Sequence, residues 1–331
     1  MMGTAVKTIG VVGAGNVSFK SHLPLLTTMG ISIPWIIDPS RRHALAAAEA
    51  YAIPVCLGAD ELDRATPTDV VLLACPYGVR QPYFEYFRDQ PVAFYVEKPI
   101  ARTGAELSQI CALRAPYQIA AGFLRRSMGI TNIMRGVVTD RLFGRLRRVR
   151  SEFGTSTAIS AGASFAKDVK LAGGGQLIES AIHNIDLICF IADVTSARVH
   201  RSHMIHEDHF DLHTEATIEL VDVHGDNIEM ELLVTCFRDT KYEIKMQFDH
   251  AMVTFSVFKH LLPQVRAHEG RSAFQLVDAV AKDYPRQIFD VAYSFWSEFL
   301  NGLEHRRANY TNAATTAVTT SIIEQLYRGH S

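Results

Sequence analysis

The chain has 331 residues, of which 48% are hydrophobic and 21% are charged, and its formal net charge is −2. This length predicts about two domains, and the composition is that of a globular protein with enough apolar residues for a sizeable core. The near-neutral charge gives no argument for binding to nucleic acid or to a membrane surface, and we predict neither partner. No apolar run reaches the roughly 18 residues that a membrane helix needs.

The start of the chain and its cysteines bear on localisation. An apolar strand pattern begins within a few residues of Met1, which leaves no room for a signal peptide in front of it. The five cysteines lie far apart and form no Cys-x-x-Cys motif, as expected of reduced core residues in a reducing compartment. We therefore predict a cytoplasmic protein.

The first 125 residues alternate between strand and helix patterns. Strand patterns occur at 7–12, 31–37, 70–74, 92–96 and 118–123, and helix patterns at 17–29, 41–51, 59–65, 80–87 and 105–113. Such short apolar runs are typical of strands that are buried on both faces of a parallel sheet. Pro34 favours a later start of the second strand, and Pro24 should kink or shorten the first helix. The alternation predicts an α/β domain with a doubly wound parallel sheet over residues 1–125.

The pattern changes after residue 125. Its elements are a helix at 130–139, a strand at 146–153, a helix at 175–192, alternating strands over 199–258, and helices at 284–304 and 312–328. Residues 154–172 are rich in Ser, Ala and Gly and predict a mobile loop, and the sequence HGDN at 224–227 marks a hairpin turn. We predict a second domain, residues 126–331, with an antiparallel sheet and helices on one face. Its last helix could pack back on the first domain.

A glycine turn, VVGAGNVS, follows the first strand. Gly13 allows the tight turn, and Gly15 lets the backbone approach a pyrophosphate, which then lies at the start of a helix beside Asn16 and Val17. Ser18 stands in the third position of G-x-G-x-x-G, where a small side chain can still be tolerated. The strand-turn-helix context predicts a dinucleotide site. The alternative is a turn with a structural role only.

The end of the second strand bears on the choice of dinucleotide. Asp38 lies where an acid can hold the ribose hydroxyls, which favours NAD. The alternative is that Asp38 is an ordinary helix cap before Pro39. Arg41 follows closely and could accept the 2′-phosphate of NADP. The sequence leaves NAD and NADP open, with a slight preference for NAD.

A lysine follows the strand at 92–96, in the tripeptide Glu97-Lys98-Pro99. Ends of such strands face the ligand crevice of an open α/β sheet. There Lys98 could donate a hydrogen bond to a substrate hydroxyl or transfer a proton. Pro99 restricts Lys98 to extended geometry and could follow a cis bond. The alternative is a solvated lysine at a strand end.

The helix predicted at 175–192 carries Glu179, His183 and Asp186 at positions i, i+4 and i+7, on one face. A histidine beside a carboxylate can move protons near neutral pH. A plain amphipathic helix with a solvated polar face would show the same pattern. The glycines that precede the helix and the Glu97-Lys98-Pro99 tripeptide favour an active site.

Together these motifs resemble the glucose–fructose oxidoreductase, inositol dehydrogenase and rhizopine-catabolism (Gfo/Idh/MocA) family over nearly the whole chain. The resemblance rests on the glycine turn followed by His22-Leu23-Pro24, CPYG at 75–78, Glu97-Lys98-Pro99, GFLRR at 122–126, AGGG at 172–175, and the acid-x-x-x-His-x-x-Asp helix. It implies an N-terminal Rossmann domain and a C-terminal α/β domain with a large open, mostly antiparallel sheet. It also implies an NAD or NADP cofactor and a homodimer or homotetramer, with substrate on one face of that sheet and a partner subunit on the other.

The resemblance assigns the family's catalytic lysine to Lys98 and its catalytic histidine to His183. Glu179 stands where the family usually has an aspartate, a departure that keeps the charge and adds a methylene. Leu124 in place of an asparagine, and a missing histidine after Pro76, are further departures. The resemblance also implies cofactor contacts from Pro76, Tyr77, Glu97 and Lys98 and a substrate contact from Arg126. Phe165, in the predicted mobile loop, could stack on a sugar ring or pack in the core.

We predict an NAD(P)-dependent dehydrogenase or reductase that acts on a sugar, cyclitol or related polyhydroxy compound. His183 would take the hydroxyl proton, Lys98 would stabilise the charge on the reacting oxygen, and Glu179 would orient the substrate or His183. Two alternatives are a glycosidase that retains NAD and uses transient oxidation, and a non-catalytic dinucleotide-binding regulator. We predict no metal site, because the histidines at 200, 203, 206, 209 and 213 have a spacing that suits neither a strand face nor a helix face.

Overall fold

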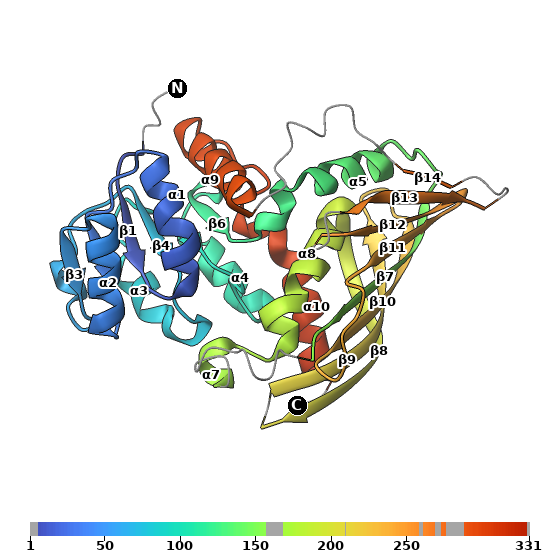
Figure 1. The fold of residues 1–331 in the computed structure, drawn as a ribbon, viewed down its shortest axis with the longest axis horizontal. Coiled ribbons are helices and arrows are strands. Elements are labelled where there is room, and N and C mark those ends of the chain that lie inside the picture. Colours follow the sequence, from blue (N-terminus) through green and yellow to red (C-terminus); the bar gives the residue numbers. More distant parts are fainter. Residues whose placement is uncertain are drawn as a thin grey trace. The chain divides into compact units, whose positions relative to one another are not determined.

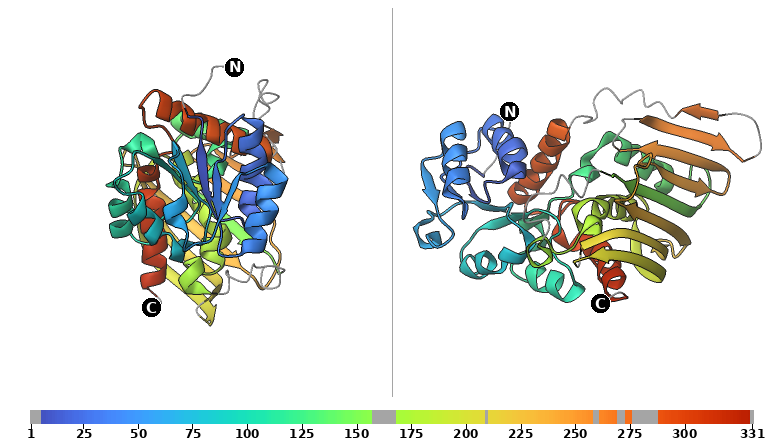
Figure 2. Two further views of the ribbon diagram at one scale, coloured as in Figure 1. Left: turned by 90° about the vertical axis from the view of Figure 1, so that its left-hand side faces the viewer. Right: turned by 60° about the horizontal axis from the view of Figure 1, so that its bottom comes forward.

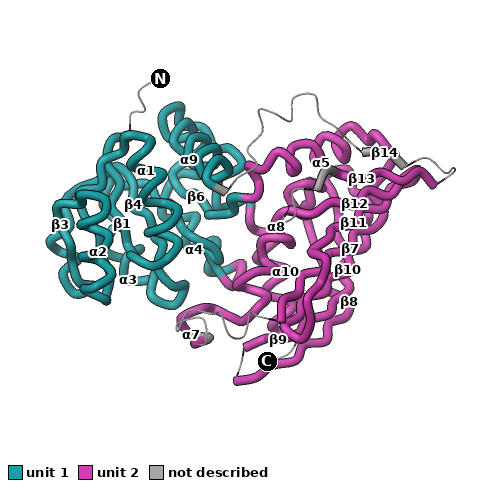
Figure 3. Tube along the Cα trace, in the orientation of Figure 1, with its two compact units in different colours: residues 1–101, 105–124, 287–315 teal, residues 102–104, 125–286, 316–331 magenta. Residues whose placement is uncertain are grey.

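The computed structural model describes residues 6–156, 168–208, 210–257, 261–268, 273–275 and 288–329. The chain forms two compact units (Figure 3). The first comprises residues 1–101, 105–124 and 287–315, and the second comprises residues 102–104, 125–286 and 316–331. Phe165 and His209, which the sequence analysis singles out, lie outside the described residues.

A six-stranded parallel sheet forms the centre of the first unit, in the order β3-β2-β1-β4-β5-β6 (Figure 1). Its strands are β1 (Ile9–Val12), β2 (Trp35–Ile37), β3 (Val55–Leu57), β4 (Val70–Leu73), β5 (Ala93–Val96) and β6 (Ile119–Ala121). Every residue of the five strands other than β3 is buried, because helices cover both faces (Figure 2). The predicted doubly wound sheet is confirmed, and β2 begins after Pro34. The edge strand β3 was not predicted; unlike the other five strands, it is only partly buried.

The helices of the first unit are α1 (Leu23–Thr28), α2 (Arg41–Tyr51), α3 (Gln81–Tyr86), α4 (Gly104–Cys111) and α9 (Ile288–Glu304). The helix predicted at 59–65 is wrong: only a 3-10 turn forms there, at Leu62–Arg64. Helix α9 belongs to this unit because its aromatic face, with Trp296 and Phe299, is buried in the core of the unit. The sequence analysis suggested that the last helix of the chain could pack back on the first domain. That helix instead belongs to the second unit. Among the described helices, none has both the length and the apolar character of a membrane span.

The helix after the glycine turn contains a π-helical turn at Ser18–His22, which continues directly into α1. Pro24 was predicted to kink or shorten this helix. In the structure the helix departs from α-helical geometry just before Pro24, in the π-turn, and α1 itself runs for only six residues. The π-turn leaves His22 fully buried, and such turns occur often at functional sites.

The second unit contains an eight-stranded mixed sheet in the order β14-β13-β12-β11-β7-β10-β9-β8. Its strands are β7 (Leu146–Gly154), β8 (Val194–Glu207), β9 (Phe210–Asp222), β10 (Asn227–Thr235), β11 (Ile244–Phe248), β12 (Ala251–Ser256), β13 (Leu261–Ala267) and β14 (Ala273–Gln275). Only β7 and β10 pair in parallel, so the predicted, mostly antiparallel sheet is confirmed. Helices α5 (Gly129–Thr139), α8 (Ile182–Ile191) and α10 (Ala317–Arg328) lie on one face of it (Figure 1).

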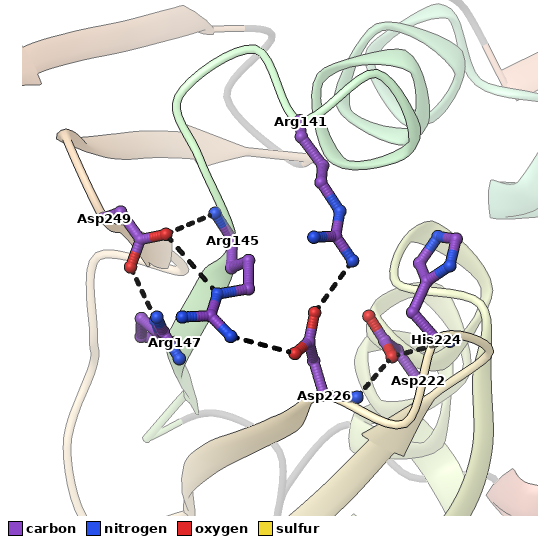
Figure 4. Close-up of polar contacts among 7 residues, drawn as sticks. All are labelled: Arg141, Arg145, Arg147, Asp222, His224, Asp226 and Asp249. Carbon is purple, nitrogen blue, oxygen red and sulfur yellow. Dashed lines mark hydrogen bonds and ion pairs between the residues drawn. The ribbon is translucent and has the colours of Figure 1, made fainter.

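Polar contacts hold the loop that enters β7 (Figure 4). Asp226 accepts from Arg141 at 2.9 Å and pairs with Arg145 at 3.4 Å. Asp249 accepts the backbone N–H of Arg145 at 2.8 Å, and Asp222 accepts two backbone N–H groups of the hairpin turn before β10, where it was predicted. Exposed pairs of this kind each contribute little to stability. Their combined effect is to fix the start of β7 relative to β10 and β11.

Candidate functional site

The glycine turn lies between β1 and a helix, as predicted. Gly13 has a φ of +99°, and a Cβ atom there would lie 2.5 Å from the carbonyl oxygen of Ala74. Gly15 is different: no atom of the described residues lies within 4 Å of the position that its Cβ would occupy. This open space at the start of a helix is what a pyrophosphate needs to approach the backbone. Ser18 is fully buried, so the third position accommodates a small side chain.

Asp38 closes the glycine turn from the end of β2. Its carboxylate accepts the backbone N–H of Ala14 at 2.7 Å and that of Ser40 at 2.8 Å, and its exposed fraction is 8%. The cap of α2 is Ser40, whose Oγ accepts the N–H of His43, and not Asp38. The predicted contact between Asp38 and a ribose stays a prediction, as does that of Arg41, which is exposed in the first turn of α2.

Three strands end together beside this turn. Val12 of β1 pairs with Leu73 of β4, and Leu73 pairs with Val96 of β5. The glycine turn, the segment after β4 and Lys98 after β5 therefore lie along one edge of the sheet, where open α/β sheets bind ligands. In the middle segment, Tyr77 donates its hydroxyl to Glu106 of α4 at 2.8 Å.

Lys98 is held by its neighbours in the first unit. The bond between Lys98 and Pro99 is cis, and the backbone N–H of Lys98 donates to Oε2 of Glu97 at 3.2 Å. The carbonyl groups of Glu97 and Pro99 accept from the guanidinium of Arg80 at 2.6 and 2.5 Å. Arg80 is buried and also donates to the carbonyl of Cys75. Burial lowers the pKa of the Arg80 guanidinium from its usual value.

Sequence reasoning missed Arg80. The available signal was a charged residue just before a helix, a few residues after a strand end that faces the ligand crevice. That signal is weak, because most arginines in such positions are solvated. Only the long-range contacts in the structure show that the Arg80 guanidinium binds backbone carbonyl groups of the segment after β5.

In the second unit, a buried carboxylate holds the glycine-rich turn that leads into the Glu179 and His183 helix. Asp211 accepts the backbone N–H groups of Gly175 and Leu177, both at 2.7 Å, and the hydroxyl of Tyr327 at 2.5 Å. Burial raises the pKa of Asp211, although these hydrogen bonds oppose the shift. Asp211 and Tyr327 lie far from this turn in sequence, which is why sequence reasoning missed both.

We expect Gly175→Ala to lower the free energy of unfolding by about 2–3 kcal/mol, because steric strain of this kind is costly. The new Cβ would lie 2.4 Å from the backbone nitrogen of Asp211, so backbone would have to move. Gly136→Ala is the matched control: no described atom lies within 4 Å of its Cβ position in α5, and it should stabilise by ~0.5–1 kcal/mol. Thermal unfolding of both variants checks this, and equal effects would contradict the assignment.

The helix does not present one polar face. A π-turn at Leu177–Ala181 precedes α8, and it changes the angular spacing of the residues on either side of it. Glu179 is exposed and His183 is half-buried, whereas Asp186 is buried with an exposed fraction of 1%. The predicted common face of these three residues is therefore corrected: Asp186 belongs to the interior of the second unit.

Arg126 is the partner of Asp186. Its Nε and Nη2 donate to the two carboxylate oxygens at 2.8 and 2.5 Å, and both side chains are almost completely buried. Thr319 of α10 adds a third contact to Asp186 at 3.2 Å. This arrangement supports a role for Arg126 in tying the unit together, and its predicted contact with substrate stays a prediction. The neighbouring Arg125 donates to Asn184 of α8 at 2.5 Å, and burial lowers its pKa to about 10.

The predicted site residues thus fall into two sets. Lys98 and the cofactor residues belong to the first unit, and Glu179 and His183 belong to the second. Within the first unit the structure brings the glycine turn, Asp38 and Lys98 to one sheet edge. Within the second unit Glu179 lies in the π-turn, and His183 and Asp186 lie in α8, where Asp186 is buried.

Comparison with known families bears on both sets. Residues 7–118 match the family described as "Oxidoreductase family, NAD-binding Rossmann fold", and residues 132–248 match the "GFO/IDH/MocA C-terminal domain". Over 122 residues the chain is 30% identical to "Putative oxidoreductase YceM" of Salmonella typhimurium. That match covers 36% of this chain and 39% of the Salmonella protein, so the chain matches well under half the length of this relative.

Two solved structures illustrate the likeness in fold. A levoglucosan dehydrogenase in complex with NADH and levoglucosan is 14% identical, with a TM-score of 0.79 and 97% of each chain covered. KijD10, a 3-ketoreductase from Actinomadura kijaniata in complex with NADP and TDP-benzene, is 12% identical, with a TM-score of 0.79 and 98% of each chain covered. The matches to both of its domains show that the chain is an NAD(P)-binding oxidoreductase of the GFO/IDH/MocA family.

Proposed function

We propose that this protein is a dehydrogenase or reductase that transfers hydride at a hydroxyl or carbonyl carbon of a sugar, cyclitol or related polyhydroxy compound. The observation that carries the proposal is the position of Lys98 on the sheet edge that also holds the glycine turn. A lysine beside a nicotinamide site can bind the reacting oxygen. A levoglucosan dehydrogenase of the same fold supports the substrate class, and a 3-ketoreductase of the same fold supports the type of reaction.

Each group has a role in the proposed reaction. When bound, the nicotinamide supplies the hydride acceptor for oxidation. Lys98 donates a hydrogen bond to the reacting oxygen and stabilises the negative charge that develops there. His183 takes the hydroxyl proton as general base, a role suited to an imidazole near neutral pH. Glu179, which is exposed, binds the substrate or orients His183.

We also propose a preference for NAD over NADP. The Asp38 carboxylate lies at the end of β2 and would repel a 2′-phosphate, whereas it can accept hydrogen bonds from ribose hydroxyls. Arg41 could offset this repulsion. To test the preference, the protein is denatured and any released nucleotide is identified, after which the stripped protein is titrated with NADH and NADPH. Tighter binding of NADPH would overturn the preference, and binding of neither would overturn the function.

We expect a panel of sugars and cyclitols, assayed with the tighter nucleotide, to include at least one substrate. His183→Asn should then lower kcat by roughly 10²- to 10⁴-fold, the usual contribution of a general base, with nucleotide binding unchanged. His224→Asn, in an exposed hairpin turn, is the control. Wild-type turnover by the His183 variant would contradict its role.

Glycoside hydrolysis without net cofactor reduction would favour the NAD-retaining glycosidase, and tight nucleotide binding without any reaction would favour the regulator.

We also propose that the protein forms the homodimer or homotetramer that the family resemblance implies. The sheet face that α5, α8 and α10 leave uncovered carries a groove of about 780 Å³ with charged side chains of both signs. Its lining includes Arg150, Arg201, Glu215 and Glu231. The arginines of one copy could therefore form ion pairs with the glutamates of a second copy. Light scattering at several protein concentrations tests this, and a monomer at all of them would contradict it.

A further inference from the structure

A buried histidine lies behind Lys98 in the first unit. His22 is the last residue of the π-turn and is fully buried. Its Nε2 lies 2.9 Å from Oε1 of Glu97, and its Nδ1 accepts the indole N–H of Trp296 at 3.1 Å. The proposed reaction assigns no role to His22 or to Trp296.

The two contacts define the protonation of His22. An indole N–H can only donate, so Nδ1 must carry a lone pair. The single proton of the neutral imidazole is then on Nε2, which donates it to Glu97. A second proton on Nδ1 would break the bond to Trp296. Trp296 is itself fixed, because its ring stacks on the buried ring of Tyr95 with the centroids 4.1 Å apart.

Glu97 connects this histidine to the lysine. Its Oε1 receives the proton of His22, while its Oε2 accepts the backbone N–H of Lys98. Burial favours a raised pKa for Glu97, whereas the hydrogen bond from His22 and the positive charges of Lys98 and Arg80 favour the carboxylate and oppose that rise. A charged carboxylate therefore sits directly beside Lys98. A Cβ at Gly122 would lie only 3.0 Å from that carboxylate, so close packing restricts it from another side.

A carboxylate in this position could compete for the lysine. If Glu97 were free to rotate, it could pair with the ammonium group of Lys98 and draw it away from a substrate oxygen. The bond from His22 holds Oε1 inward and opposes that rotation. Arg80, which binds the carbonyl groups of Glu97 and Pro99, holds the backbone on both sides of Lys98.

We propose that His22 is a positioning residue for Lys98, acting through Glu97 in a neutral tautomer that Trp296 of α9 determines. The inference rests on the proposed catalytic role of Lys98. It gives helix α9 a part in the geometry of the strand end after β5. Among the described residues, the titratable groups in contact with His22 are Glu97, which follows β5, and Tyr95 of β5.

Kinetics of three variants test the proposal. His22→Phe keeps an aromatic ring and removes both hydrogen bonds, so kcat should fall by about 10²-fold, as expected of a misplaced reacting group. The nucleotide Kd and the KM should stay within about twofold of wild type. His22→Gln places an amide donor near Nε2 and should recover at least about tenfold of the loss. Trp296→Phe keeps an aromatic ring and removes the N–H donor to Nδ1, so the Nε2–H tautomer loses its determinant and kcat should fall, by less than in His22→Phe.

A second measurement does not depend on turnover. Nitrogen-15 NMR of histidine-labelled protein should show one buried imidazole as a neutral Nε2–H tautomer, which disappears in His22→Phe. A charged imidazolium or the Nδ1–H tautomer would overturn the proposal. So would wild-type kcat in His22→Phe alongside an inactive Lys98→Met. Wild-type turnover in Lys98→Met would instead remove the proposed function, a result that is distinct from failure of the His22 inference. If His22→Phe does not fold, the kcat of Trp296→Phe and the NMR tautomer of His22 in the wild type decide.

Discussion

Replacing Lys98 by methionine should lower kcat by roughly 10²- to 10³-fold, the usual cost of removing one donor that stabilises a developing oxyanion. Methionine keeps the length and the apolar stem of the side chain and removes the ammonium group. Nucleotide binding should persist, because the pyrophosphate is expected to contact the backbone of the glycine turn, where Gly15 leaves open space. Steady-state kinetics and nucleotide titration on the same preparation give both quantities.

Lys7→Met is the matched control for this experiment. Lys7 is exposed and lies at the amino end of β1, opposite the glycine turn, so the variant should retain the kcat of the wild type. Equal kcat values for the Lys98 and Lys7 variants would eliminate Lys98 from the reaction. Joint loss of turnover and nucleotide binding in Lys98→Met would instead indicate that the lysine supports the cofactor site.

Asp186→Ala should lower the free energy of unfolding by about 3–5 kcal/mol, the range seen when one partner of a buried ion pair is removed. The guanidinium of Arg126, with an exposed fraction of 3%, would remain in the interior without its counter-ion. Thr319 would also lose its acceptor. Urea denaturation followed by circular dichroism measures the change, with the slope compared to confirm that the same surface unfolds.

Two further variants show whether the loss of stability in Asp186→Ala comes from the unpaired charge of Arg126. Glu229→Ala removes an exposed pair with Arg148 and should cost less than about 1 kcal/mol. A double variant, Arg126→Met with Asp186→Leu, should recover most of the stability, since apolar replacements of a buried pair are often neutral. If this double variant is stable and has an unchanged KM, Arg126 acts only within the unit. A sharply raised KM would support the predicted contact with substrate.

The local features of the fold were predictable from the sequence. The alternation of short apolar runs with helix patterns predicted the parallel sheet, and the turn at 224–227 predicted a hairpin. The glycine turn and the strand end at Lys98 were predictable for the same reason: each depends on neighbours within a few residues. The local prediction failed at two places. The partly buried edge strand β3 was missed, and the helix expected at 59–65 is only a 3-10 turn.

What the sequence by itself determined was the class of fold and the positions of the candidate reactive groups. The tertiary structure decided which polar groups are buried and what they bind. His22 meets Trp296, and Gly175 meets Asp211, across separations that no local pattern records. The polar stripe of the predicted helix could not show that Asp186 is buried, because hydrophobic periodicity does not register the arginine that neutralises a carboxylate. The carboxylate of Asp186 can be buried because a partner of opposite charge lies beside it, and tertiary packing brings that partner into contact with it.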